Sequence, residues 1–153
     1  MIMEDYVSFE TAKLLKEKGF DEPCQFLYFS KYKQEGDFVG NFNARKNSEI
    51  NETSYSAPTH QMVMNWLEEV HHILVIPDYI YECTDTSWVY KIYRLRENGK
   101  PERCAVKGVS YDDDNNPTEH IVGYRDYDVS YKDYVTREEA EEDGIRYVLE
   151  KYV

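Results

Sequence analysis

The histidine pair His71-His72 is the first place in the chain where side chains could hold a metal ion. Three cysteines could approach it in the folded chain: Cys24, Cys83 and Cys104. Adjacent residues on a helix point in different directions, so both imidazoles cannot easily bind one ion. The H-x-x-x-H and C-x-x-C spacings typical of zinc sites are absent. We therefore predict no metal site and interpret the pair as a helix end, where partial positive charge is favourable.

Residues 112–117, DDDNNP, have the oxygen-rich composition of a calcium-binding loop. An EF-hand loop beginning at Asp112 would place oxygen ligands at Asp112, Asp114 and Asn116. Its sixth residue would be Pro117 instead of glycine, and its twelfth would be Gly123 instead of glutamate. The run therefore predicts a solvent-exposed β-turn.

The sequence contains no common catalytic motif. The G-x-S-x-G elbow, the P-loop and the dinucleotide-binding G-x-G-x-x-G are all absent. A Cys–His nucleophile pair or a carboxylate pair stays open, because such partners lie far apart in sequence. With three cysteines, four histidines and 30 acidic residues, however, no individual pair is diagnostic. We name no catalytic residue and predict no cofactor.

Tyrosine is unusually frequent, with 15 copies, and many of them fall in the strand-rich half of the chain. On a half-exposed sheet tyrosine is an ordinary residue. Several tyrosines on one exposed face would form the rigid amphipathic surface that protein interfaces favour. The predicted interaction surface comprises Tyr79, Tyr81, Tyr90, Tyr93, Tyr124 and Tyr127. Its partner would be another protein or a second copy of this chain.

Composition and charge limit the possible classes of protein. The 153 residues fit one domain, and 41% hydrophobic content argues against disorder. The net charge is −12, of which −8 lies in residues 111–153, which hold 13 acidic and 5 basic residues. Such a field repels phosphate backbones, so we expect no direct binding to nucleic acid.

The N-terminal sequence MIMEDYVSFE lacks the features of a secretory signal. The longest aliphatic run, residues 73–76, ends at Pro77 and is far too short to span a bilayer. The odd number of cysteines fits reduced thiols. These features predict a cytoplasmic protein without a membrane segment.

Helix signals lie at both ends and in the middle of the chain. Ser8 is a good N-cap for a short helix that ends before Gly19. A central helix is predicted from Ser56 to about His71, with Trp66 and Leu67 on its apolar side. A final helix follows Thr136, which forms a T-x-x-E capping box, and it carries an apolar stripe with Val148 and Leu149.

Strands are predicted at residues 25–32, 73–76, 79–81, 88–95 and 120–124, from their apolar and β-branched character. Asn98-Gly99 predicts a hairpin that pairs Ile92 with Ala105 and Trp88 with Val109. Because this register also opposes Arg94 to Arg103, a longer loop with a shifted register stays open. Residues 34–55 show no periodicity and are predicted to form a long irregular loop.

Together these elements predict a single α+β domain over residues 1–153. We expect an antiparallel sheet of about four to five strands, with two main helices on one face and a short N-terminal helix.

Four segments carry a resemblance to other sequences: SFETAK at 8–13, YSAPTH at 55–60, WLEEVH at 66–71 and EEA at 138–140. In these segments the chain resembles small uncharacterised proteins of phages and integrated mobile elements of gut Bacteroidetes. The resemblance implies a cytosolic accessory protein and transfers no site residue.

Three functions remain in view. The leading hypothesis is a noncatalytic accessory domain that binds another protein. The alternative is an acidic decoy that mimics DNA and binds a host nucleic-acid-binding protein, which would need carboxylates in phosphate-like rows. The weakest is a small enzyme with a Cys/His or carboxylate site, which would need a pocket with converging polar groups.

Overall fold

The computed structural model describes residues 5–30, 37–81, 86–130 and 132–153, which form an α+β fold with antiparallel strand pairing throughout. The helices are α1 (Phe9–Glu17), α2 (His60–His71) and α3 (Arg137–Lys151), with a short 3-10 helix η1 (Asn47–Glu49). The strands are β1 (Cys24–Phe29), β2 (Asp37–Arg45), β3 (Ser54–Ser56), β4 (Ile73–Tyr81), β5 (Thr86–Arg94), β6 (Cys104–Tyr111), β7 (Pro117–Arg125) and β8 (Asp128–Val129).

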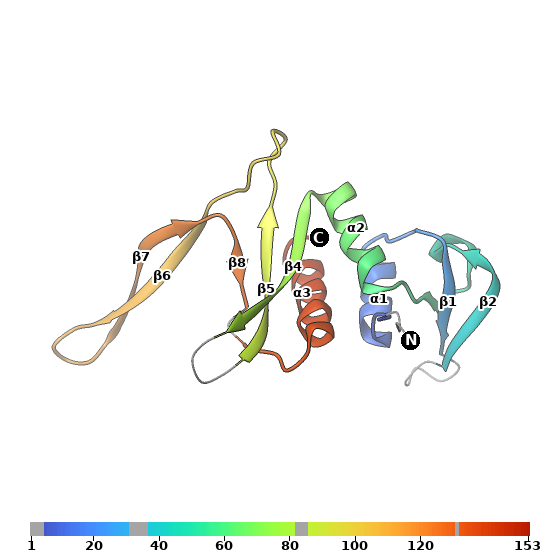
Figure 1. Cartoon of the computed structure of the whole chain (residues 1–153), viewed down its shortest axis with the longest axis horizontal. Coiled ribbons are helices and arrows are strands. Elements are labelled where there is room, and N and C mark those ends of the chain that lie inside the picture. Colours follow the sequence, from blue (N-terminus) through green and yellow to red (C-terminus); the bar gives the residue numbers. More distant parts are fainter. Residues whose placement is uncertain (1–4, 31–36, 82–85, 131) are drawn as a thin grey trace.

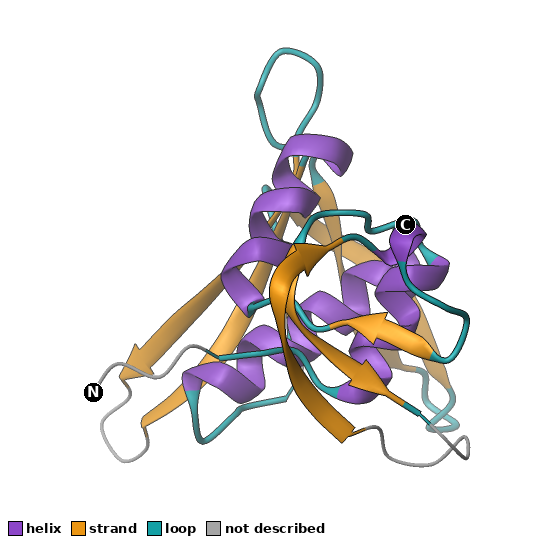
Figure 2. Ribbon diagram, turned by 90° about the vertical axis from the view of Figure 1, so that its right-hand side faces the viewer, coloured by secondary structure: helices purple, strands orange, loops and turns teal. Residues whose placement is uncertain are grey.

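The strands form three small sheets instead of the expected single sheet of four to five strands. Their orders are β2-β1-β3, β4-β5-β8 and β6-β7. Helices α1 and α2 lie between the first two sheets, and α3 packs against β4 and β5 (Figure 1). The β2-β1-β3 sheet covers the helices from the other side (Figure 2). The prediction that helices cover one face of a sheet therefore holds only for the β4-β5-β8 sheet, which we call the central sheet.

The two predicted main helices do bury their apolar sides. Trp66 and Leu67 of α2 and Val148 and Leu149 of α3 are all buried in the core. The same core includes Val75 and other residues of the central sheet, so one hydrophobic cluster joins the two main helices to it. Burial of each such side chain contributes about 1.5–3 kcal/mol.

The short N-terminal helix α1 is capped as predicted. The Ser8 side chain accepts a hydrogen bond from the backbone N–H of Thr11. After the helix, Gly19 adopts a φ of +86°, and the Phe20 N–H donates to the Leu15 carbonyl at 2.9 Å. A left-handed residue of this kind ends many helices, and glycine adopts the conformation without a Cβ penalty.

The irregular loop predicted at 34–55 is wrong over most of its length; residues 34–36 lie outside the described residues. Strand β2 pairs with β1, and the Phe38 and Phe26 rings stack with centroids 5.0 Å apart. Residues 37–40 of β2 are all exposed, because β2 is an edge strand. An edge strand with little burial shows no clear alternation, and its pairing depends on a partner that the local sequence does not reveal.

The predicted start of the central helix at Ser56 is also wrong. Ser56 belongs to β3, where it pairs with Leu27 of β1, and the N-cap is Thr59, whose side chain accepts from the Met62 N–H at 3.2 Å. The end near His71 is confirmed, with His72 in the left-handed conformation.

Strand β4 runs without interruption through Pro77, joining the two short strands predicted there. It is an edge strand, in which proline is tolerated.

The turn at Asn98-Gly99 forms with the longer loop that the sequence left open. Leu95 bridges to Pro101, and Arg94 forms an ion pair with Glu102 at 3.0 Å, so the Arg94–Arg103 opposition is avoided. The predicted pairs of Ile92 with Ala105 and of Trp88 with Val109 are wrong. Strand β5 instead pairs with β4 and β8, while β6 pairs with β7 and forms a two-stranded arm that extends away from the helices (Figure 1).

Gly144 of α3 allows this helix to approach the central sheet closely. A Cβ added there would lie 2.9 Å from Val75 Cγ1 and 3.0 Å from Tyr90 Cγ. Gly144→Ala should therefore destabilise the protein by about 1–2 kcal/mol, because overpacking exceeds the gain of about 1 kcal/mol in helix propensity. Urea unfolding measures the change. Gly123→Ala, with no heavy atom near its added Cβ, is the matched control; an unchanged Gly144→Ala midpoint would contradict this packing.

Candidate functional site

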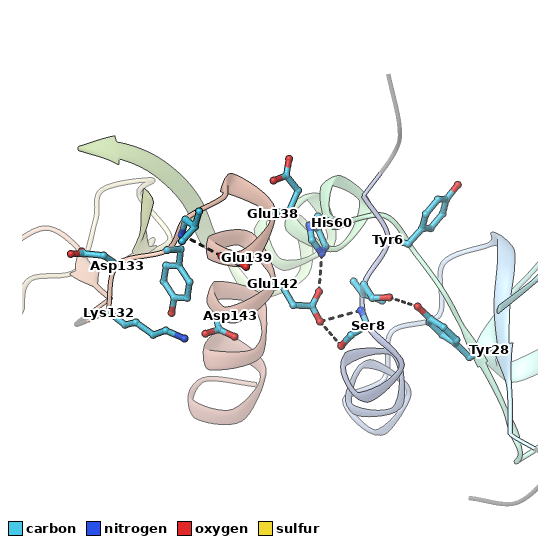
Figure 3. A pocket seen from close by; sticks show the side chains of 13 residues that line it. Tyr6, Ser8, Tyr28, His60, Lys132, Asp133, Glu138, Glu139, Glu142 and Asp143 are labelled. Carbon is cyan, nitrogen blue, oxygen red and sulfur yellow. Dashed lines mark hydrogen bonds and ion pairs between the residues drawn. The ribbon is translucent and has the colours of Figure 1, made fainter. Parts of the chain in front are cut away.

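The N-terminus of α1 and the second turn of α3 both lie next to His60, the first residue of α2. Its imidazole is buried, with 5% of the residue exposed. Nδ1 lies 3.1 Å from a carboxylate oxygen of Glu141, and Nε2 lies 2.8 Å from one of Glu142 (Figure 3 shows the Glu142 contact). Because carboxylates only accept, both contacts require a proton on each ring nitrogen. His60 is therefore an imidazolium that donates at both nitrogens.

The two carboxylates are themselves fully engaged. Glu142 Oε1 accepts from the Ser8 N–H at 3.1 Å, from the Ser8 hydroxyl at 2.5 Å and from the Thr11 hydroxyl. Glu141 Oε1 accepts from the Arg137 Nε at 2.7 Å. Two anions thus face two cations, His60 and Arg137. Such a network is stable when buried because each charge is paired and hydrogen-bonded.

The pKa values follow from this geometry. Burial alone would lower the pKa of His60, but the hydrogen bonds to Glu141 and Glu142 raise it to about 9. Burial likewise opposes ionisation of both glutamates, yet their hydrogen bonds lower the pKa of each. At neutral pH the network is charged and saturated. His60 has no free nitrogen with which to act as a general base.

A cavity of about 550 Å³ opens beside this network. Figure 3 shows Lys132 and Asp133 toward one end, Tyr6 and Tyr28 toward the other, and Glu142 between them. The lining residues are Tyr6, Val7, Ser8, Tyr28, His60, Lys132, Asp133, Tyr134, Val135, Glu138, Glu139, Glu142 and Asp143.

Tyr134 forms a fixed wall of this cavity. It is buried, and its backbone exchanges two hydrogen bonds with Trp88, at 2.9 and 2.8 Å. Burial and the hydrogen bond with the Asp143 carboxylate raise the pKa of its hydroxyl. The Lys132 ammonium lies over the Tyr134 ring, 5.1 Å from the centroid.

The β6–β7 arm presents a second candidate site. Register places four large apolar side chains on one face, which we call the arm face: Val109, Tyr111, Ile121 and Tyr124. Their exposed fractions are 53%, 64%, 55% and 60%. Lys107 and Glu119 form an ion pair at 3.2 Å on the same face. A bulge between Val106 and Lys107 turns Val122 to the opposite face, where it lies over Gly108.

The structure does not gather the six predicted tyrosines into one surface. Tyr90 is buried in the core against α3, so it cannot contribute to an exposed surface. Tyr79 and Tyr81 are exposed at the end of β4, and Tyr79 contacts Trp88 with ring centroids 5.2 Å apart.

The other three predicted tyrosines lie elsewhere. Tyr93 and Tyr127 contact each other at 5.4 Å, and Tyr93 lies on the sheet face opposite to Tyr90 because strand residues alternate. The Lys91 ammonium lies over the Tyr127 ring at 4.9 Å. Tyr124 alone belongs to the arm face.

The histidines and cysteines considered as metal ligands either contact other groups or do not lie together. His71 lies against the Trp66 ring, with centroids 4.7 Å apart, and His72 is exposed. Burial raises the pKa of the Cys24 thiol to about 11, and Cys83 lies outside the described residues. Across the part of the chain that the structure describes, no three His, Cys, Asp or Glu side chains could together hold a metal ion.

Of the turn predicted at 112–117, residues 112–116 form the turn and Pro117 begins β7; Asp112 supports the turn from within. Its carboxylate accepts from the N–H groups of Asp114 and Asn116 and from the Asn116 side chain.

Sequence reasoning missed the His60 network. A cation at the positive end of a helix is unfavourable, so a histidine there is a signal for an anionic partner. The signal was hidden because the helix was predicted to begin at Ser56, which would place His60 a full turn inside it. Glu141 and Glu142 lie 81 and 82 residues further along the chain.

Comparison of the chain with protein-family models, with curated proteins and with solved structures finds no match. Among the described helices, none is both long enough and apolar enough to cross a membrane.

The His60 network predicts a distinctive dependence of stability on pH. The pKa of His60 is about 9 in the folded protein against 6.5 unperturbed, so its stabilisation is complete below about pH 6.5 and is lost as the pH rises through about 9. The loss is at most about 3 kcal/mol. Urea unfolding between pH 6 and 10 should show this decline in the wild type and a flatter profile in His60→Gln. His72→Gln, at the exposed end of the same helix, should keep the wild-type profile; equal slopes in all three proteins would refute the assignment.

Proposed function

We propose that the protein is a noncatalytic protein-binding domain and that the arm face docks its partner. The observation that carries this proposal is the exposure of four large apolar side chains on a two-stranded sheet: Val109, Tyr111, Ile121 and Tyr124. Apolar patches of this kind, bordered by polar residues, are typical of interaction sites.

The architecture of the arm supports the same interpretation. Both of its strands pair only with each other, and neither makes an extensive contact with any other described element. An isolated two-stranded hairpin is marginally stable in water. A partner that covers the arm face would remove apolar surface from water and stabilise the arm. The partner is either another protein or a second copy of this chain.

The saturated His60 network weighs against an enzyme. A catalytic acid or base must be able to exchange a proton with the substrate. Both ring nitrogens of His60 and both carboxylate oxygens of Glu142 are already hydrogen-bonded to other groups of the protein. Cys24 is buried with a raised pKa, so it lacks the thiolate character of a nucleophile.

The distribution of carboxylates weighs against a DNA mimic. Five of the 13 acidic residues in 111–153 form ion pairs with basic side chains: Glu119, Asp128, Glu141, Glu142 and Glu150. Two more are used locally, Asp112 in its turn and Glu139 in its capping box. Carboxylates neutralised in this way supply little of the phosphate-like field that a decoy needs.

The resemblance to proteins of phages and integrated mobile elements supports an accessory role for this domain in such an element. As that resemblance implies, we place the domain in the cytoplasm.

The arm face can be tested by shortening its apolar side chains. Val109→Thr combined with Ile121→Thr keeps β-branched residues while removing apolar area, and should weaken partner binding about tenfold or more. Crosslinking in the native host followed by quantitative mass spectrometry measures the capture of each partner. Sedimentation of the purified protein shows whether the partner is a second copy.

The matched control is Ser110→Thr combined with Thr118→Ser, on the opposite face of the same strands. It should retain binding, and circular dichroism should show both variants folded. Equal capture by wild type and the Val109→Thr/Ile121→Thr variant would exclude the arm face as the docking surface.

A further inference from the structure

The chain carries a second uncovered apolar surface besides the arm face. It lies on the side of the central sheet opposite to α3, where no described helix packs (Figure 1), and we call it the open face. Because strand residues alternate, Val75 and Tyr90 point into the core and their neighbours in β4 and β5 point away from it. Ile76 on this face is 42% exposed. The accessible apolar residues of the open face are Leu74, Ile76, Ile80, Tyr93 and Val129.

We propose that the partner of the arm face is a second copy of this chain, and that the arm of each copy lies over the open face of the other. The inference rests on the proposed docking role of the arm face and names its occupant. Four observations carry it: the fixed direction of the arm, the neutrality of both apolar faces, the opposite charges at their ends, and the area that two such contacts bury.

The arm is held away from the open face of its own chain. Only residues 126 and 127 separate the end of β7 from β8. Arg125 pairs with Asp128 at 3.5 Å, and Asp128 also accepts a hydrogen bond from the Tyr147 hydroxyl of α3 at 2.7 Å. These contacts tie the base of the arm to α3, and the arm extends outward from there (Figure 1). The open face is therefore left to the arm of a second copy.

Both apolar faces are electrically neutral, although the chain has a net charge of −12. The charged residues of the arm face, Lys107 and Glu119, pair with each other at 3.2 Å. Those of the open face, Lys91 and Asp78, pair at 2.6 Å. Two copies of an acidic protein repel each other wherever carboxylates are in excess, so their contact needs neutral surfaces of this kind. A basic partner would instead be attracted to unpaired carboxylates, which neither face offers.

Positive charge is concentrated in the loop between β5 and β6, which we call the basic loop. Its Arg96, Lys100 and Arg103 are exposed, and none of them forms an ion pair with a described residue. They outnumber Glu97, the acidic residue of this loop that is not paired. The basic loop follows β5 directly and protrudes past the end of the central sheet (Figure 1). It therefore lies just beyond one end of the open face.

The tip of the arm carries the opposite charge. Asp113 and Asp114, in the turn between β6 and β7, are exposed and form no ion pair with a described residue. An arm that lies along the strands of the open face, with its tip toward the basic loop, brings these carboxylates to the cations of the second copy. Complementary charges at the ends of two neutral apolar faces fix the direction of the arm in the contact.

The area of contact favours an exchange of two arms over a single contact. The arm has two strands, and β6 has eight residues, so the arm face measures about 26 Å by about 10 Å. One arm on one sheet then buries about 500 Å² in total, which is less than the roughly 1,000 Å² of a specific interface. Two arms exchanged about a twofold axis reach that value. We expect a weak dimer with a Kd on the order of 10 μM.

Sedimentation equilibrium of the full chain measures this dimer. Ile76→Thr removes apolar area from the open face and leaves the arm face intact. It should raise the Kd for dimerisation about tenfold, because a twofold dimer contains the substitution twice. Val70→Thr is the matched control: Val70 is 56% exposed in α2 and belongs to neither face, so the wild-type Kd should be kept. Circular dichroism should show both variants folded.

A charge exchange tests the direction of the arm. Asp113→Lys combined with Asp114→Lys changes the net charge from −12 to −8, which lowers the general repulsion between copies. The proposed contact nevertheless predicts a Kd about tenfold higher, because the tip would then meet a loop of like charge. Arg96→Glu combined with Lys100→Glu should weaken the dimer in the same way. All four substitutions together restore both the net charge and the attraction, and should recover the wild-type Kd.

Three outcomes would each overturn the proposal: a wild type that stays monomeric at millimolar concentration, equal Kd values for Ile76→Thr and Val70→Thr, or no recovery in the fourfold variant. None of them excludes docking of a different protein at the arm face, because Ile76 and the basic loop lie outside that face. Loss of partner capture by Val109→Thr/Ile121→Thr, together with a monomeric wild type, would reject the second copy and retain the arm face.

Discussion

We call the helices and the two sheets packed against them the body of the protein. The interaction on which the body depends is the pair of contacts that His60 makes with Glu141 and Glu142, which we call the clamp. It joins the first turn of α2 to the first half of α3, and through Ser8 and Thr11 it also joins α1. The N-termini of α1 and α2 meet there, and their partial positive charges favour the two carboxylates. The carboxylates in turn make the imidazolium of His60 stable in a place where neither burial nor the helix dipole would favour it.

The clamp also limits what chemistry this region can do. Both ring nitrogens of His60 and both carboxylate oxygens of Glu142 already have hydrogen-bond partners in the protein. The network therefore holds the helices in place and has no free group that could exchange a proton with a substrate. The neighbouring cavity is lined partly by this network and partly by exposed carboxylates outside it, such as Asp133 and Glu138.

The β6–β7 arm is stabilised in a different way from the body. The body buries one continuous core between helices and two sheets, whereas β6 and β7 have only each other. Their cross-strand pairs, such as Lys107 with Glu119, stabilise the ribbon locally without covering its apolar face. The apolar residues left on this face are the observation behind our proposal that the arm docks a protein partner.

The sequence by itself determined the local elements. The capping box at Thr136, the left-handed Gly19, the apolar stripes around Trp66 and Val148 and the turn at Asn98-Gly99 all depend on neighbouring residues, so their patterns could be read directly. Tertiary structure alone decided the pairing of β2 with β1, the separation of the strands into three sheets, the burial of Tyr90 and the meeting of His60 with two glutamates more than 80 residues away. These depend on which surfaces meet across long stretches of chain, and a local pattern of residue types carries no information about the identity of a distant partner.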